Sequence, residues 1–380
     1  MNRLFSLILV LTVISSSCGS RTGIISKDDE IYTDSSYASG RYSLDKVNEI
    51  RKLVITNPWQ NSRGIELVYY LVPYDKPLPD TLSEENVIRV PVKRIICMST
   101  THVAMLRALG VADAIVGISG TDLLYDTLLR EEVRNGMLPD VGYESNLDRE
   151  LVVSLKPDLL MAYNIGAPSE YMRKLEAMGV KVMYNADYLE QHPLARCGWI
   201  RVFGALTGHE GMADSLLGAV TSRYRELAAK VRNTASVRPD VLLGAPWEDS
   251  WYVSPSNSYI GRLINDAGGH YLFYDLAAPN SVPYSVEAVF RRAADADVWI
   301  NPGAAGTLAE IEAADRRLAR LPVYREGNVW NNRKRMTTTG GNDYWESAVV
   351  HPDILLKDLV SIMHPDLLPG YVPFYYKRLQ

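Results

Sequence analysis

The fold is decided by residues 94–118, RIICMSTTHVAMLRALGVADAIVGI. A short apolar run opens this segment, apolar residues at helical spacing follow over 102–110, and Gly110 marks the end of the helix. A second apolar run, 114–119, comes directly afterwards. Strand, helix and strand in this order predict a parallel sheet that is covered by helices.

The same alternation recurs in both halves of the chain. Residues 157–163 are predicted as a strand, 169–179 as a helix and 180–185 as the next strand. Segments 154–164 and 293–303 resemble each other, because each contains a helix end, an Asp and a buried strand. The sequence therefore predicts an α/β protein with two Rossmann-like lobes, each a central, largely parallel sheet flanked by helices.

One long helix is predicted between the lobes. Apolar residues recur at helical spacing over 209–234, which at about 1.5 Å per residue gives a helix of roughly 35–40 Å. A helix of this length can span two lobes. We therefore expect a first ligand-binding lobe at 93–208, a spanning helix at 209–236, and a second lobe at 237–380 that carries a C-terminal helix and an aromatic tail.

Two further segments precede the first lobe. Residues 18–45 are polar and rich in Ser, Gly and Asp, which is typical of a flexible tether. Residues 46–92 contain β-rich runs separated by turn clusters, and they predict a small antiparallel β extension.

The N-terminus has the features of an export signal. Arg3 is followed by an apolar run over residues 4–14, which is too short to span a bilayer, and then by small residues and Cys18. We interpret residues 1–17 as a signal peptide and Cys18 as a lipidation site that anchors the protein to a membrane surface. An ordinary signal peptide cleaved nearby is the alternative.

Composition excludes several classes of protein. The 380 residues contain 40 Lys and Arg against 45 Asp and Glu, a net charge of −5, which argues against nucleic-acid binding because phosphate neutralisation needs a basic surface. Three cysteines are too few for a disulfide framework. Cys97 and Cys197 are predicted to be buried free thiols, although a bond between them stays open.

No catalytic motif is present, and the sequence predicts a protein that is not an enzyme and carries no cofactor. GxSxG, the P-loop, a dinucleotide fingerprint and HExxH are all absent. The six histidines include no i,i+4 pair, so no bare metal site is predicted. His102, just after a strand, is the best single candidate for a ligand contact, and helix capping is its alternative role.

Aromatic and polar residues follow many of the predicted strands. Ligands of open parallel sheets bind outside the carboxyl ends of the strands. Tyrosine is unusually common, with 23 Tyr against 5 Phe, and its flat apolar ring with a hydroxyl suits a large, partly polar ligand. The predicted ligand-binding residues are His102, Tyr143, Tyr163, Tyr188, Trp247, Trp251, Tyr284, Trp330 and Arg333.

These segments resemble a known family. Residues 94–118, 138–163 and 174–184 are similar to the first lobe of the iron-siderophore and cobalamin substrate-binding lipoproteins of ABC importers, and 281–303 to the second lobe. The resemblance implies a periplasm-facing, lipid-anchored monomer on a bacterial membrane. It implies that the protein captures a ferric siderophore, haem or cobalamin between its lobes and delivers it to an ABC permease with its ATPase.

The resemblance also implies two docking residues. In this family one surface Glu on each lobe binds arginines of the permease. These positions fall on Glu150 and Glu287, each near a predicted helix start, where the helix dipole favours a carboxylate. Asp148 is the alternative on the first lobe if the register slips by two residues.

Two other functions remain open at this point. One is a bare Zn- or Mn-binding component of an ABC importer, which has the same fold, and the sparse histidines count against it. The other is an enzyme on the same two-lobed fold, which would need cysteine ligands or catalytic acids that Cys97 and Cys197 alone do not supply.

Overall fold

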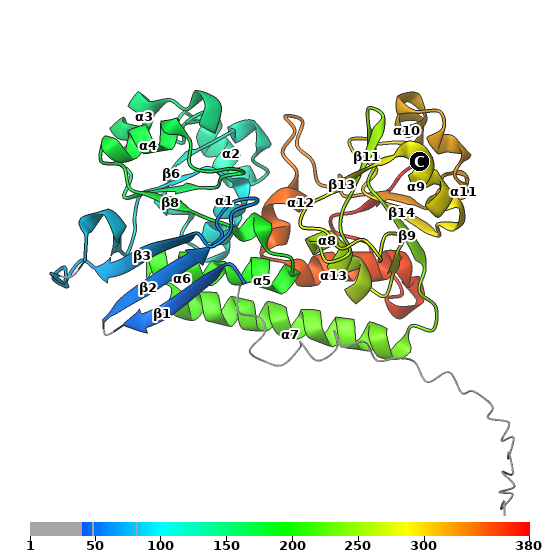
Figure 1. The fold of residues 1–380 in the computed structure, drawn as a ribbon, viewed down its shortest axis with the longest axis horizontal. Helices are drawn as coiled ribbons and strands as arrows, with labels where there is room; N and C mark the ends of the chain where they lie inside the picture. The colour runs from blue at the N-terminus through cyan, green and yellow to red at the C-terminus, as the bar shows by residue number, and fades with distance from the viewer. Residues whose placement is uncertain (1–39, 48, 81) are drawn as a thin grey trace, which may run out of the picture. The chain divides into compact units, whose positions relative to one another are not determined.

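The computed structural model describes residues 40–47, 49–80 and 82–380, and it contains both predicted α/β lobes (Figure 1). The predicted signal peptide, Cys18 and the tether up to residue 39 lie outside the described residues. Within the part of the chain that the structure describes, no helix is long and apolar enough to cross a membrane.

The first lobe is built on a parallel sheet of order β6-β5-β7-β8, as predicted. Every residue of β5 and β7 is buried, which explains why these strands are continuous apolar runs rather than alternating ones. The strands are β5 (Ile95–Cys97), β6 (Ile115–Ile118), β7 (Leu159–Ala162) and β8 (Val182–Tyr184). The helices are α1 (Thr100–Ala108), α2 (Thr127–Arg134), α3 (Arg149–Ser154), α4 (Glu170–Ala177), α5 (Pro193–Gly198) and α6 (Ile200–Thr207).

Helix α1 begins at Thr100, two residues earlier than expected. Ser99 is extended, and its hydroxyl accepts the amide hydrogen of Thr101 at 3.2 Å, which caps the helix directly after β5. Gly110 ends this segment with a φ of 72°, a conformation that favours glycine. The capped turn places the first residues of α1 at the carboxyl edge of the sheet.

The second lobe contains a sheet of order β12-β9-β14-β15-β16, in which only β16 is antiparallel to its neighbour. A small antiparallel sheet, β10-β11-β13, lies in the same lobe. The strands are β9 (Asp240–Leu243), β10 (Pro246–Trp247), β11 (Ser250–Val253), β12 (His270–Tyr271), β13 (Val282–Ser285), β14 (Val298–Ile300), β15 (Val329–Asn331) and β16 (Lys377–Arg378). The helices are α8 (Tyr259–Asp266), α9 (Val286–Arg292), α10 (Leu308–Ala314), α11 (Pro322–Arg325), α12 (Asp343–Glu346) and α13 (Pro352–Met363).

The aromatic tail is part of this lobe's core. Tyr375 and Tyr376 are fully buried, and the residues after them form β16. Asp358 of α13 fixes the tail, because its carboxylate accepts the amide hydrogens of Phe374 at 2.7 Å and Tyr375 at 2.6 Å. A buried carboxylate that is hydrogen-bonded in this way gives the tail one defined path.

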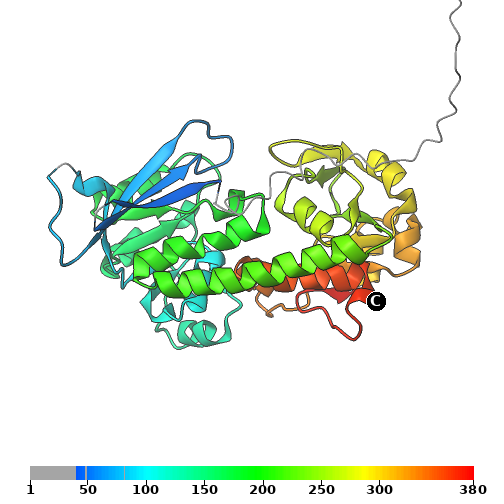
Figure 2. The same ribbon diagram turned by 90° about the horizontal axis from the view of Figure 1, so that it is seen from below.

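The predicted spanning helix is α7 (Glu210–Thr234), and it runs along both lobes (Figures 1 and 2). Leu217, Val220, Tyr224 and Val231 recur at helical spacing and are buried, which gives the helix one apolar face. The Tyr224 hydroxyl also donates to Asp266 of α8 at 2.6 Å. Helix α7 is therefore packed against the molecule along its length.

The N-terminal extension differs from the prediction in two respects. Its sheet has the order β1-β2-β3-β4, and its strands are antiparallel except that β3 and β4 are parallel. The connection over residues 74–86 is long enough to bring the chain back to the end of the sheet where β3 began, which a parallel pair requires. Strand β1 also begins at Tyr42, inside the segment predicted as tether. The strands are β1 (Tyr42–Val47), β2 (Ile50–Thr56), β3 (Glu66–Pro73) and β4 (Val87–Val90).

Several contacts join this extension to the first lobe and α7. Arg51 forms a two-point ion pair with Glu210, with both N–O distances 2.8 Å. The Tyr42 hydroxyl donates to the Gly198 carbonyl at 2.7 Å, and the Tyr42 ring lies 4.9 Å from that of Trp199. These contacts make the extension an integral layer of the protein.

The open question about the two thiols is resolved. Cys97 in β5 and Cys197 in α5 are both buried and free. Burial raises the pKa of each thiol, which keeps both protonated and unreactive.

Candidate functional site

The carboxyl edges of the two sheets approach each other at Arg196 of α5. Its Nε donates to the buried carboxylate of Asp187 at 3.0 Å, and its guanidinium lies 5.4 Å from the ring centroid of Tyr259 in the second lobe. Burial disfavours the charged guanidinium, but Asp187 outweighs this effect and the pKa of Arg196 is raised. Arg196 therefore stays charged between the lobes.

Tyr344 of α12 forms the second-lobe side of this cluster. It is buried, and desolvation raises its pKa, while the neighbouring Tyr376 hydroxyl and the amides of Asn301 and Asn332 oppose the rise. Asn301 follows β14 and Asn332 follows β15, so both lie at the carboxyl edge of the second sheet. We call Asp187, Arg196, Tyr259 and Tyr344 the interlobe polar cluster.

A segment of the second lobe, residues 333–346, lies between the lobes and contacts the first lobe (Figure 1). The Glu346 carboxylate accepts the amide hydrogens of Tyr125 at 2.7 Å and Asp126 at 2.9 Å. The guanidinium of Arg335 lies 5.1 Å from the Tyr125 ring centroid. Burial raises the pKa of Glu346 to about 7, although the two amide bonds act in the opposite direction.

Three of the predicted ligand-binding aromatics are exposed. Tyr143 is 46% exposed, Tyr163 is 40% exposed and Trp247 is 71% exposed. Tyr163 directly follows β7 and Trp247 closely follows β9, so both lie at carboxyl ends of sheet strands. Large apolar rings left in water at a strand end are typical of a ligand surface.

Local backbone geometry holds Tyr143 in place. Its ring packs against Gly120, where an added Cβ would lie 2.6 Å from the ring, and Gly120 has a φ of 69°. Asp140 ties the two loops together by accepting the amide hydrogens of Gly120, Thr121 and Gly142. Burial opposes ionisation of Asp140, but these hydrogen bonds prevail and lower its pKa.

Tyr188 is half-buried beside Tyr163. Their ring centroids lie 6.1 Å apart in an edge-to-face arrangement, and the Tyr188 hydroxyl donates to the Asn164 carbonyl. Burial raises the pKa of Tyr188 to about 12, so the hydroxyl stays protonated. Tyr188 therefore supports Tyr163 and exposes part of its own ring.

Two of the predicted ligand residues are fully buried in the structure. His102 is fully buried and its ring lies 6.0 Å from that of Phe203, because the first turn of α1 directs this position into the core. Burial lowers the pKa of His102 to about 4, so the ring is neutral. Trp251 is also fully buried, and its indole Nε1 donates to the Leu243 carbonyl at 3.0 Å.

Three further predicted residues are half-buried. Tyr284 is half-buried, with its ring 5.3 Å from that of Phe273 in the second-lobe core. The Trp330 indole donates to the Asn328 side chain at 2.9 Å, towards the amino end of β15 rather than its carboxyl end. Arg333 follows β15 and is half-buried.

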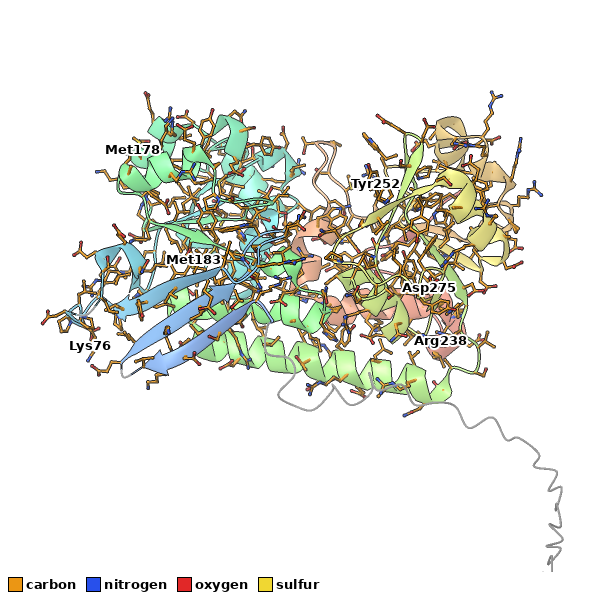
Figure 3. The ribbon with its side chains drawn as sticks, viewed as in Figure 1. Lys76, Met178, Met183, Arg238, Tyr252 and Asp275 are labelled. Carbon is orange, nitrogen blue, oxygen red and sulfur yellow. The ribbon has the colours of Figure 1, made fainter. Side chains whose placement is uncertain are left out.

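Three further candidate residues were not predicted from the sequence. Trp345 of α12 is 58% exposed, and its ring lies 4.7 Å from that of Tyr344 between the lobes. Tyr252 is exposed because it alternates with buried Trp251 along β11, as period-two alternation would have indicated (Figure 3). Arg196 has no local sequence signal, because its second-lobe neighbour Tyr259 comes from a distant part of the chain.

The described residues contain no group of three or more His, Cys, Asp or Glu side chains that could hold a metal ion. The candidate site combines exposed aromatic rings on both lobes with a buried polar cluster between the lobes. Such a combination can bind a large ligand through its faces and its polar groups.

Two α/β lobes that are joined by one long helix, with the carboxyl edges of their sheets towards each other, define a two-lobed ligand-binding protein. The chain matches the periplasmic binding protein family over residues 95–335. It belongs to this family.

Individual relatives are distant. An uncharacterized lipoprotein of Methanocaldococcus jannaschii is 26% identical over 318 residues, which is 80% of this chain and 74% of the relative. A cobalamin-binding protein of Halobacterium salinarum is 26% identical over 66% of each chain. The crystal structure of a periplasmic haem-binding protein from Pseudomonas aeruginosa superposes with a TM-score of 0.57 at 20% identity, covering 76% of this chain and 98% of the other. This last similarity shows the fold alone.

Proposed function

We propose that this protein is the substrate-binding component of an ABC importer and captures a metal chelate between its lobes. The chelate is cobalamin or an iron complex, either haem or a ferric siderophore. One observation carries this proposal: both lobes expose large aromatic rings, and a buried, charge-paired cluster joins the two lobes at Arg196. The relative named for cobalamin binding supports the ligand class.

The chemistry of the site suits such a ligand. A flat macrocycle can bury the exposed faces of four aromatic rings, those of Tyr143, Tyr163, Trp247 and Trp345. Removing this apolar surface from water stabilises the complex by about 25 cal/mol for each Å² buried. Polar groups at the edge of the chelate can pair with hydroxyl and amide groups near the interlobe polar cluster. Capture of this kind needs no bond to form or break, so we propose a role without catalysis.

We propose that Glu150 and Glu287 bind the permease. Both are exposed and lie in the first turns of α3 and α9, respectively, where a carboxylate is favoured. Glu287 is paired with Arg317 at 3.0 Å, so docking would exchange this arginine for one from the permease. An exposed pair of this kind is weak, and the exchange costs little.

We propose that the mature protein is a lipid-anchored monomer facing the periplasm, with Cys18 as the acylated N-terminus. The support is the apolar run over residues 4–14 followed by small residues and Cys18. Mass spectrometry of the N-terminal peptide from the native host is the test. An unmodified terminus at another residue would contradict the anchor.

A ligand titration tests the proposed function. Purified protein is titrated with cyanocobalamin, haemin, a ferric hydroxamate, Zn²⁺ and Mn²⁺, with tryptophan fluorescence and calorimetry as readouts. We expect one chelate to bind with a Kd of about 1 μM or below, which corresponds to about −8 kcal/mol, and no tight binding of either free metal. Tight binding of Zn²⁺ or Mn²⁺ without any chelate binding would overturn the proposal.

A further inference from the structure

The loop between β2 and β3, residues 57–65, lies outside the segment that matches the family. It joins two neighbouring antiparallel strands of the N-terminal extension. Asn57 has a φ of 49° and Asn61 a φ of 62°, and asparagine tolerates this left-handed region better than most residues. The loop is thus built from tight turns.

Hydrogen bonds fix the shape of this loop. The amide hydrogen of Asn57 bonds to the Ile65 carbonyl at 2.8 Å, and the Ser62 hydroxyl donates to the Trp59 carbonyl at 2.5 Å. Arg41 also donates to the Asn57 carbonyl at 3.1 Å. A loop with this many internal bonds presents its side chains in a defined arrangement.

The loop is bound to the first lobe beside the predicted ligand aromatics. The Gln60 amide donates to the Ile165 carbonyl at 3.1 Å, and the Gln60 backbone also lies close enough to the Tyr188 hydroxyl to lower its pKa slightly against the effect of burial. Ile165 and Tyr163, which follow β7, are both exposed. The loop therefore borders the apolar part of the first-lobe surface.

The loop also reaches the second lobe. The Asn280 side-chain amide donates to the Asn61 side-chain oxygen at 3.1 Å. In Figure 2 the blue extension and the orange 333–342 segment lie on opposite sides of α7. The interlobe site is therefore bordered by the 57–65 loop on one side and by the 333–346 segment on the other.

We infer that the 57–65 loop is a third wall of the ligand site, and that the half-exposed Trp59 ring contacts the bound chelate. This inference rests on the proposed function. A ligand held between Tyr163 of the first lobe and the second lobe cannot extend past this side without meeting the loop. A large chelate with an apolar periphery is the ligand class that a tryptophan on a rigid loop recognises.

The experiment compares variants of the full chain in titrations with cyanocobalamin, haemin and a ferric hydroxamate. Trp59→Ala should weaken binding of the accepted chelate about fivefold or more, and Trp59→Phe should restore most of the affinity because it keeps a ring. The control is Tyr74→Ala, a more exposed aromatic in the connection that also carries Lys76, at the end of the extension away from the second lobe (Figure 3). This control should bind like the wild type.

The outcomes separate the two proposals. If the wild type binds none of the three chelates, the proposed function is overturned and the inference is overturned with it. If the wild type binds one chelate and Trp59→Ala binds it equally well, only the third wall is overturned. Thermal unfolding of each variant accompanies the titration. Equal midpoints for Trp59→Ala and Tyr74→Ala show that lost affinity comes from a lost contact rather than from a loosened extension.

Discussion

Trp247 and Trp251 lie four residues apart in the second lobe and have opposite surroundings. Trp247 is 71% exposed, whereas Trp251 is fully buried with its ring 6.2 Å from that of Trp299. Along β11 the side chains alternate between the core and the solvent, and Trp251 falls on the core side. Residue type alone therefore does not distinguish a ligand contact from a core residue.

This contrast gives a matched prediction. Trp251→Ala should destabilise the protein by about 3–5 kcal/mol, because it leaves a cavity and removes a buried ring. Trp247→Ala should change stability by only about 0.5 kcal/mol but weaken chelate binding about tenfold. Chemical denaturation and ligand titration of both variants measure the two effects. The reverse result would place the ligand surface elsewhere.

Asp140 provides a prediction that depends on pH. Its carboxylate joins the loops under Tyr143, and its pKa lies below the usual 3.8. A lowered folded-state pKa means that the stabilisation is present above the unfolded pKa and is lost as the pH falls through the folded one. Asp140→Asn should cost about 1 kcal/mol at neutral pH, discounted because the side chain is partly exposed.

The check is a series of thermal melts from neutral to acidic pH. The difference between wild type and Asp140→Asn should shrink as the wild-type carboxyl is protonated. A difference that stays constant down to strongly acidic pH would show that the charge is irrelevant. Asp113→Asn, a change at another acidic residue of the first lobe, is the control.

At the scale of elements, α12 and the segment before it are the connection that sequence reasoning did not predict. Glu346 accepts two backbone amide hydrogens from the first lobe in a buried position. Glu346→Ala should therefore destabilise the protein by about 2–4 kcal/mol, since both amides of the first lobe lose their partner. Denaturant unfolding measures this loss. An unchanged midpoint would show that water replaces the carboxylate at no cost.

The titration of Glu346 predicts a second effect. Its folded-state pKa is about 7 against a usual value of 4.5, so the folded protein holds this proton more tightly than the unfolded chain. The stability of the wild type should therefore fall as the pH rises between about 4.5 and 7. Glu346→Gln, which cannot ionise, should lack this slope. A parallel pH dependence in both proteins would contradict the raised pKa.

At the scale of the whole molecule, α7, the 333–346 segment and the 57–65 loop all connect the lobes, in addition to the contact of Arg196 with Tyr259. A continuous helix resists hinge bending, and the other two connections add hydrogen bonds on either side. We therefore expect only a small change in the small-angle scattering profile when the chelate binds. A marked decrease of the radius of gyration on binding would contradict this expectation. It would mean that the contacts of the 333–346 segment and the 57–65 loop form only when the chelate is bound.

Permease docking also belongs to this scale. Replacing Glu150 and Glu287 together with Ala should leave chelate affinity unchanged and reduce transport more than about tenfold, since close interfacial charge pairs can contribute about 1.5–7 kcal/mol. Glu170→Ala, another exposed first-turn glutamate, is the control. Transport assays in reconstituted vesicles, with titrations alongside, measure both quantities. Lost chelate affinity in the double variant would contradict the docking role.

The sequence by itself determined the α/β class, both parallel sheets and the spanning helix. These features follow from local periodicity, which is written into runs such as 94–98 and 209–234. Strand ends could also be read from the sequence, and they led to Tyr143, Tyr163 and Trp247.

Only the tertiary structure decided which polar groups meet and which side chains are hidden. Arg196 meets Tyr259, and Glu346 meets Tyr125, across large sequence separations that no local pattern encodes. His102 is buried because α6 covers the first turn of α1, which its position after a strand does not reveal. Local periodicity fixes elements, whereas a site between lobes depends on contacts that exist only after the elements have packed.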